Sequence, residues 1–301
     1  ERLKGEHKLE FLKEDLRDHD KVGFQIRQFD PEIIVHLAAR TEVQDSFYEQ
    51  ITFSEINYVG TVNLIEIAAS LPNLKNFVFA STMEVYGWQP ISDLIRDGKE
   101  ESIIAFNEST PPNPNAPYAV AKYGCEKYLE YAHRSYGLPF TAIRQTNAYG
   151  RKDNNFFVTE QIIYQMLTNE KEINLGYGEP YRNFIYIDDL LDAWQAVIEN
   201  PDKCQGEIFC IGPDNAIKIK DYVTLIASKL GWTGHVNWNT KPPRPGEIYL
   251  LNSTNHKITT RLGWAPKVGL NEGLDRTIAV WKDIVENNLP HNQDRRFSKG
   301  K

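Results

Sequence analysis

The sequence predicts an α/β protein built on a doubly wound parallel sheet, and three features indicate this fold class. Continuous apolar runs such as Ile33–Ala39 and Phe77–Ala80 are typical of strands that are buried on both faces. Stretches with helical apolar spacing, Ser54–Leu71 and Tyr118–Tyr136, alternate with these runs, and Gly137 suits a helix C-cap. Strands and helices that alternate in this way form a parallel sheet with helices on both faces.

The order of elements becomes less regular after about Gly150, where we expect a second, smaller region packed against the carboxyl edge of the sheet. The chain is therefore divided into residues 1–148 and 149–301, with segments around 183–212 returning to the sheet. The run Pro242-Pro243-Arg244-Pro245-Gly246 is expected to be a loop. Further strands are expected at Phe140–Ile143, Asn183–Ile187 and Glu207–Gly212, and helices at Glu160–Thr168, Asp188–Glu199, Lys220–Leu230, Thr254–Leu262 and Leu270–Glu286.

Composition argues against several classes of partner. The net charge is -7 and the lysines and arginines are scattered, so we expect no nucleic-acid partner, although a few local arginines can still bind an anionic small substrate. The apolar runs are too short to span a bilayer, so no membrane partner is expected. Cys125, Cys204 and Cys210 form an odd set without a CxxC pair, which favours a reduced, cytoplasmic compartment and no metal site.

The chemistry is predicted from two short segments. Tyr118 and Lys122 are four residues apart on a predicted helix, so they lie on one face, and a nearby positive charge can lower a tyrosine pKa into a useful range. Thr82 and Glu84 follow the strand Phe77–Ala80, and ligands of parallel sheets bind at the carboxyl ends of strands. Each segment also has an ordinary interpretation, as a solvated helix face or as a polar strand exit.

Together these segments resemble the extended short-chain dehydrogenase/reductase family, in its nucleotide-sugar epimerase and dehydratase branch, over nearly the whole chain. The resemblance implies a Rossmann-like domain that binds NAD in residues 1–148 and a mainly substrate-binding region in 149–301. Tyr118 and Lys122 match the catalytic pair, and Thr82 matches the hydroxyl of the triad. Cofactor contacts are implied for Asp15 and Leu16 in an adenine-contacting turn, for Leu37, Ala38 and Ala39 at a strand end, and for Tyr118 and Lys122.

The resemblance also implies a nucleotide-diphosphate sugar as the substrate. Asn147 lies in the segment that resembles the turn at the diphosphate, and Arg182 and Arg244 lie in segments that resemble its phosphate-binding arginines. The family normally begins with GxxGxxG, and this pattern occurs nowhere in residues 1–301. We therefore expect that a strand, helix and strand precede Glu1, through truncation or disorder.

Glu84 favours a 4,6-dehydratase within this branch, because a carboxylate can remove the C5 proton of a 4-keto sugar. Simple 4-epimerases in the family usually have a small residue there. Met83 departs from the acidic residue that many 4,6-dehydratases carry before the glutamate, so a 4-epimerase remains the alternative. A uronate decarboxylase is less favoured, because Leu251–Asn255 lacks the expected basic residue, and a non-catalytic binding protein on this fold is a further alternative.

The family also often forms homodimers through the helix that carries the tyrosine and lysine. Tyr128, Leu129 and Ala132 are apolar positions on that helix, so we expect a homodimer that pairs there. The other interpretation is that these three residues face the sheet.

Overall fold

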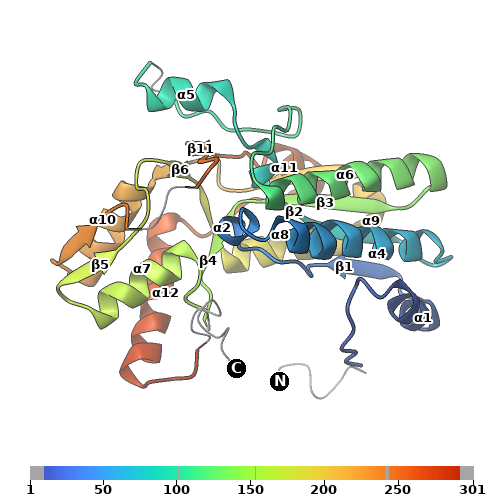
Figure 1. The fold of residues 1–301 in the computed structure, drawn as a ribbon, viewed down its shortest axis with the longest axis horizontal. Coiled ribbons are helices and arrows are strands. Elements are labelled where there is room, and N and C mark those ends of the chain that lie inside the picture. The colour runs from blue at the N-terminus through green and yellow to red at the C-terminus, as the bar shows by residue number, and fades with distance from the viewer. Residues whose placement is uncertain (1–9, 100–101, 153, 241–243, 292–301) are drawn as a thin grey trace.

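The computed structural model describes residues 10–99, 102–152, 154–240 and 244–291. Its main sheet contains four parallel strands in the order β1 (Ile33–His36), β2 (Asn76–Thr82), β3 (Phe140–Gln145) and β8 (Glu207–Ile211) (Figure 1). Thr82 pairs with Gln145, and Gln145 pairs with Ile211, so three strands reach their carboxyl ends at the same level. The α/β fold with a parallel sheet is therefore confirmed.

Helices cover both faces of this sheet because the side chains of β2 alternate. Phe77 and Phe79 pack in one core cluster with residues of α4 (Gly60–Ala69) and α6 (Pro117–Tyr136). Val78 and Ala80 point the other way and pack with residues of α8 (Ile187–Glu199) and α11 (His256–Leu262). The apolar run of β2 is continuous because both of its faces are buried.

The C-terminal region, at the left of the molecule in Figure 1, has a core of its own. Helices α7 (Val158–Thr168), α10 (Ile219–Leu230) and α12 (Leu270–Glu286) supply most of its side chains. Phe184 and Tyr222 stack within it, with ring centroids 4.1 Å apart. Three small sheets accompany this region: β4 (Asn147–Tyr149) with β7 (Phe184–Tyr186), β5 (Glu172–Asn174) with β10 (His235–Asn237), and β6 (Tyr181–Arg182) between β11 (Leu250–Leu251) and β9 (Ile217–Lys218).

Several boundaries differ from those expected. The strand at Ile33 ends at His36, and the helix expected over Ser54–Leu71 is a π-helix, η1 (Glu55–Val59), followed by α4. The expected strand Asn183–Ile187 is shorter and pairs with β4 rather than with the main sheet. In the expected loop, Pro242 and Pro243 lie outside the described residues.

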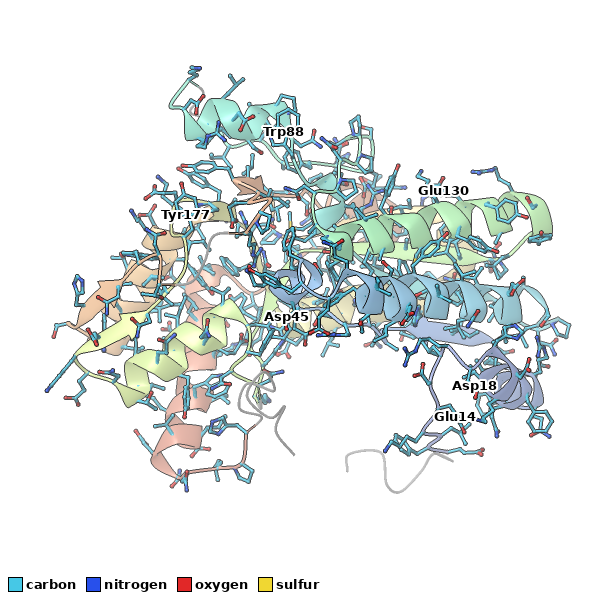
Figure 2. The ribbon with its side chains drawn as sticks, in the orientation of Figure 1. Glu14, Asp18, Asp45, Trp88, Glu130 and Tyr177 are labelled. Atoms are coloured by element: carbon cyan, nitrogen blue, oxygen red, sulfur yellow. The ribbon has the colours of Figure 1, made fainter. Side chains whose placement is uncertain are left out.

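Some helices were not expected from the sequence. Helix α1 (His19–Phe29) begins where the Asp18 side chain accepts a hydrogen bond from the backbone N–H of Lys21, and Figure 2 labels Asp18 at that end. Helix α5 (Pro90–Arg96) projects from the top of the molecule in Figure 1. The remaining short helices are α2 (Val43–Ser46), α3 (Gln50–Ser54), the 3-10 turn η2 (Met83–Tyr86) and α9 (Pro201–Cys204).

Cys125, Cys204 and Cys210 are all buried and free. Across the described part of the chain, no helix combines the length and apolarity that a membrane crossing needs. The same residues contain no group of three or more His, Cys, Asp or Glu side chains arranged to hold a metal ion.

Candidate active site

The expected catalytic residues meet where β2 ends and α6 begins. Thr82 is the last residue of β2, and Tyr118 lies in the first turn of α6, which Pro117 opens. Proline suits this position because the missing N–H would have no partner in the helix. A side-chain hydrogen bond joins Tyr118 to Thr82, so the hydroxyls of two distant segments lie together.

Lys122 lies one helical turn after Tyr118 and is buried, with 3% of its surface exposed. Its Nζ donates a hydrogen bond to the carbonyl of Ala80 at 2.8 Å and lies 4.8 Å from the ring centroid of Phe79. Burial lowers the pKa of Lys122 to about 8, although the nearby Cys125 and Glu126 act in the opposite direction. The ammonium is therefore held at the strand end by a backbone carbonyl.

The expectation that Lys122 lowers the pKa of Tyr118 is wrong for this structure. Burial raises the Tyr118 pKa, the Glu84 carboxylate raises it further, and the hydrogen bond with Thr82 lowers it only in part. The physical reason is that the Lys122 ammonium is bonded to Ala80, while a carboxylate lies near the phenol. A buried phenol beside a negative charge keeps its proton.

Glu84 lies in the turn η2 and has a carboxylate oxygen without a partner. The Thr82 hydroxyl caps this turn by accepting a hydrogen bond from the Glu84 backbone N–H at 3.2 Å. Glu84 Oε2 is buried and has no hydrogen-bond partner in the structure. Its negative charge acts on both Tyr118 and Arg182. Buried acceptors of this kind are rare in proteins and are often found at functional sites.

Met83 does not share this environment. Its side chain is 2% exposed and packs in a core cluster with Tyr86, Phe106 and Leu250. Glu84 is therefore the acidic side chain that this turn offers to the site.

The expected cofactor residues of the strand end lie directly after β1. Leu37 is 60% exposed, Ala38 is also exposed and Ala39 is half-buried. His36 pairs in register with Phe79, so Leu37 follows beside Ala80, the residue that binds Lys122. The chain after this turn is tied to the fully buried Asn57, which accepts from the Arg40 N–H and donates to the Arg40 carbonyl, both at 2.8 Å.

Asp15 and Leu16 form a turn against the start of α4. Asn63 Nδ2 donates to the Leu16 carbonyl at 3.1 Å, and Leu16 packs over Gly60, where an added Cβ would lie 3.3 Å from the leucine Cβ. The Asp15 carboxylate is exposed and binds Arg17, which lowers the Asp15 pKa to about 2. A charged acceptor therefore remains at the surface of this turn.

Two of the expected diphosphate residues lie on short strands, Asn147 on β4 and Arg182 on β6, and Arg244 lies in a loop before β11. Arg182 is 9% exposed and donates to Glu247 at 3.0 Å. Burial lowers the pKa of Arg182, Glu247 and Glu84 oppose this shift, and the positive charge of Arg244 adds to it. Asn147 Nδ2 donates to the Asn183 carbonyl at 3.3 Å, which places it one residue from Arg182. The positive charges of Arg182 and Arg244 therefore act on each other, and such a pair of guanidinium groups is a favourable site for an anion.

Three buried residues beside the site were not among those expected: Tyr86, Glu126 and Arg144. Glu126 is four residues after Lys122, so the spacing that paired Tyr118 with Lys122 also indicated this position. Arg144 directly follows the run expected as a buried strand, Phe140–Ile143, and a charged residue at such a place is a second signal.

Comparison with known proteins agrees with this arrangement. The model of the family described as GDP-mannose 4,6 dehydratase matches residues 1–277. The UDP-glucose 4-epimerase of Mycolicibacterium smegmatis is 30% identical over 280 residues, 92% of this chain and 84% of the relative. The human dTDP-D-glucose 4,6-dehydratase is 28% identical over 297 residues, 95% of this chain and 79% of the relative.

Two solved structures share the fold closely. The UDP-glucose 4-epimerase of Thermotoga maritima, solved with UDP-glucose, has a TM-score of 0.80 and 28% identity, covering 91% of this chain and 85% of its own. The dTDP-glucose 4,6-dehydratase of Streptomyces venezuelae, solved with NAD, has a TM-score of 0.80 and 25% identity, covering 94% and 82%. The chain belongs to the family of the matching model, within the nucleotide-sugar epimerase and dehydratase branch of the extended short-chain dehydrogenase/reductases.

Proposed function

We propose that this chain catalyses the 4,6-dehydration of a nucleotide-diphosphate sugar, with NAD as its cofactor. The observation that carries the proposal is the buried Glu84 Oε2, which has no hydrogen-bond partner and lies beside Tyr118 and Thr82. A dehydratase needs a base for the C5 proton, and a simple 4-epimerase does not. Relatives of both kinds match this chain, and the carboxylate is the observation that favours the dehydratase.

NAD fits the residues at the ends of β1 and β2. The exposed apolar turn at Leu37, Ala38 and Ala39 would lie along the cofactor, with the Asp15 and Leu16 turn nearer its adenosine. Lys122 would hold its ribose, because an ammonium has three donors and only one is used at Ala80. When bound, NAD supplies an acceptor for the hydride from C4 and returns it to C6.

The side chains of the chain perform the proton transfers. Tyr118 takes the proton of the C4 hydroxyl, which requires its raised pKa to fall, and positive charge brought against the phenol has this effect. Thr82 orients that hydroxyl. Glu84 removes the C5 proton, which the neighbouring ketone makes acidic. Since Met83 is apolar and buried, Glu84 also passes this proton to the C6 hydroxyl, which leaves as water. A proton from solvent then returns to C5 when hydride is returned to C6.

The substrate diphosphate would lie between the two regions of the chain, residues 1–148 and 149–301. Arg182 and Arg244 would bind it by charge-assisted hydrogen bonds, with Asn147 as a neutral donor. Arg244 forms no ion pair among the described residues, which leaves its guanidinium for the phosphates.

A 4-epimerase is the second candidate, and the apolar Met83 is the observation that favours it. An experiment with Glu84→Gln separates the two activities. The variant keeps size and polarity but removes the base, so it should still reduce bound NAD with substrate and then stall at the 4-keto sugar. In heavy water, the wild type should place deuterium at C5 and yield a product lighter by one water, as mass spectrometry would measure. A wild-type product of unchanged mass with inverted C4 would establish the epimerase instead.

We also expect the chain to form a homodimer through α6, where the half-buried Tyr128 can still contribute but the other two residues named above cannot. Leu129 and Ala132 are buried at 0% and 1% exposure and face the sheet, so their assignment to a dimer interface is wrong. Val120 on α6 and Val59 in η1 are 54% and 45% exposed, and burying such apolar surface favours pairing. Light scattering at micromolar concentration should give twice the chain mass, and Val120→Glu should give a monomer.

A further inference from the structure

A buried network of charges and hydroxyls adjoins the candidate site. Glu126 on α6 is fully buried, and Arg144 on β3 is 3% exposed. Arg144 binds the Glu126 carboxylate with two parallel contacts, Nε to Oε1 at 3.0 Å and Nη2 to Oε2 at 2.7 Å. The hydroxyl of Ser81, the residue before Thr82, donates to the same carboxylate. Both carboxylate oxygens are therefore occupied by groups of the sheet.

The same network extends to the turn that carries Glu84. Arg144 Nη1 donates to the hydroxyl of Tyr86 at 3.0 Å, and Tyr86 is two residues after Glu84 in η2. The Tyr86 hydroxyl donates to the Asn107 carbonyl at 2.8 Å and lies 2.9 Å from the Cys210 sulfur. The side chain is fully buried, so its hydroxyl is held from three directions.

Three successive residues of β2 are joined to three successive turns of α6. Ala80 accepts from Lys122, Ser81 donates to Glu126, and Thr82 bonds to Tyr118. The contact between Ser81 and Glu126 continues through Arg144 to Tyr86. Burial alone would lower the pKa of Arg144, but the Glu126 carboxylate outweighs it and raises this pKa, so Arg144 keeps its charge beside the sheet.

We propose that Glu126, Arg144 and Tyr86 are positioning residues that hold the Glu84 turn in register with the Thr82 and Tyr118 pair. All three side chains are buried, so they act through the groups that they hold and not by touching the substrate. Chemistry at C4 and at C5 of one sugar requires two sets of groups at fixed separation, and a displacement of about 1 Å can cost about 100-fold in rate. A network with every member bonded provides that rigidity.

Tyr86→Phe tests this inference, because it removes the hydroxyl and keeps the ring. The inference rests on the proposed function, since the measured step is proton removal by Glu84. We expect C5 deuterium exchange to slow at least about 10-fold, with KM changed less than about twofold. Reduction of bound NAD by substrate, which does not use Glu84, should slow less than about threefold.

Tyr222→Phe is the matched control. Tyr222 is also fully buried, its hydroxyl lies 2.9 Å from that of Thr159, and it belongs to the core of the C-terminal region. Both variants lose one buried hydroxyl and should lower the melting temperature similarly, but only Tyr86→Phe should separate the two rates. Equal rates for C5 exchange in the two variants would overturn the inference.

Ser81→Ala distinguishes this inference from the proposed function and does not depend on a dehydratase. The variant removes the hydrogen bond from Ser81 to Glu126, so the end of β2 that carries Thr82 is less well positioned. NAD reduction by substrate should therefore slow about 10-fold, in a dehydratase or an epimerase alike. If the wild-type protein reduces NAD with substrate but does not exchange the C5 proton, the proposed dehydration is refuted and the positioning role is not. The network is refuted if Ser81→Ala then reduces NAD at the wild-type rate.

Discussion

Two arginine–glutamate pairs lie in the two regions of this protein, and they differ in how completely they are bonded. Arg144 and Glu126, beside the main sheet, have side chains 3% and 0% exposed and share two contacts. Arg182 and Glu247, in the C-terminal region, are 10% and 25% exposed and share a single contact at 3.0 Å. The charge of Arg244 also acts on Arg182.

The difference indicates that the two arginine–glutamate pairs have different roles. The pair at the sheet also bonds to Ser81 and Tyr86 and is buried out of reach of a ligand, so it serves to hold geometry. The pair in the C-terminal region keeps free guanidinium donors and a second positive charge nearby, so it can accept phosphate oxygens. Three measurements would break or sharpen this comparison.

The largest expected effect is on stability. Arg144→Met leaves the Glu126 carboxylate buried without its positive partner, which should lower the free energy of unfolding by about 3–5 kcal/mol. Arg182→Met leaves Glu247, which is 25% exposed, able to reach water, so its cost should be about 1 kcal/mol. Urea unfolding of both variants would measure this, and equal losses would contradict the distinction between the two pairs.

A smaller effect concerns His36, a buried group at the sheet that is kept neutral. Burial lowers its pKa to about 3, and the charge of Lys122 contributes. The unfolded chain takes up this proton below about pH 6.5 while the folded chain does not, so stability is lost as pH falls, by about 1.4 kcal/mol per pH unit.

His36→Gln cannot titrate but keeps a donor for the Thr61 hydroxyl, which the His36 Nε2 contacts at 2.8 Å. Between pH 6.5 and 5 the wild type should therefore lose about 2 kcal/mol more than the variant. Urea unfolding at several pH values would measure it, and parallel pH profiles would show that His36 does not contribute.

The smallest expected effect is on substrate binding. Arg244→Lys keeps the charge but not the two-pronged geometry, so KM should rise about 10-fold, about 1.4 kcal/mol, with turnover changed less than about threefold. Arg261→Lys is the matched control, since this 48% exposed arginine binds Glu207 at the surface and should leave KM unchanged. Steady-state kinetics would check both. A collapse of turnover with binding intact would show that Arg244 has another role.

Much of the fold could be predicted because it depends on neighbours in the chain. Apolar runs buried on both faces located β2 and β3, and Gly137 ends α6 in the left-handed conformation with φ 71°, as expected. The spacing of Tyr118 and Lys122 on one helix face was likewise visible. Periodicity and helix caps involve residues a few positions apart, so a linear sequence contains them.

The properties of the site were decided only by the tertiary structure. The pKa of Tyr118 moves opposite to the expected direction because burial and Glu84 act on it, and Lys122 binds Ala80, 42 residues away. Cys210 meets Tyr86 across 124 residues, and no local pattern contains that contact. Burial and partner choice depend on which distant segments pack together, and these two quantities set the charge and the position of every group in the site.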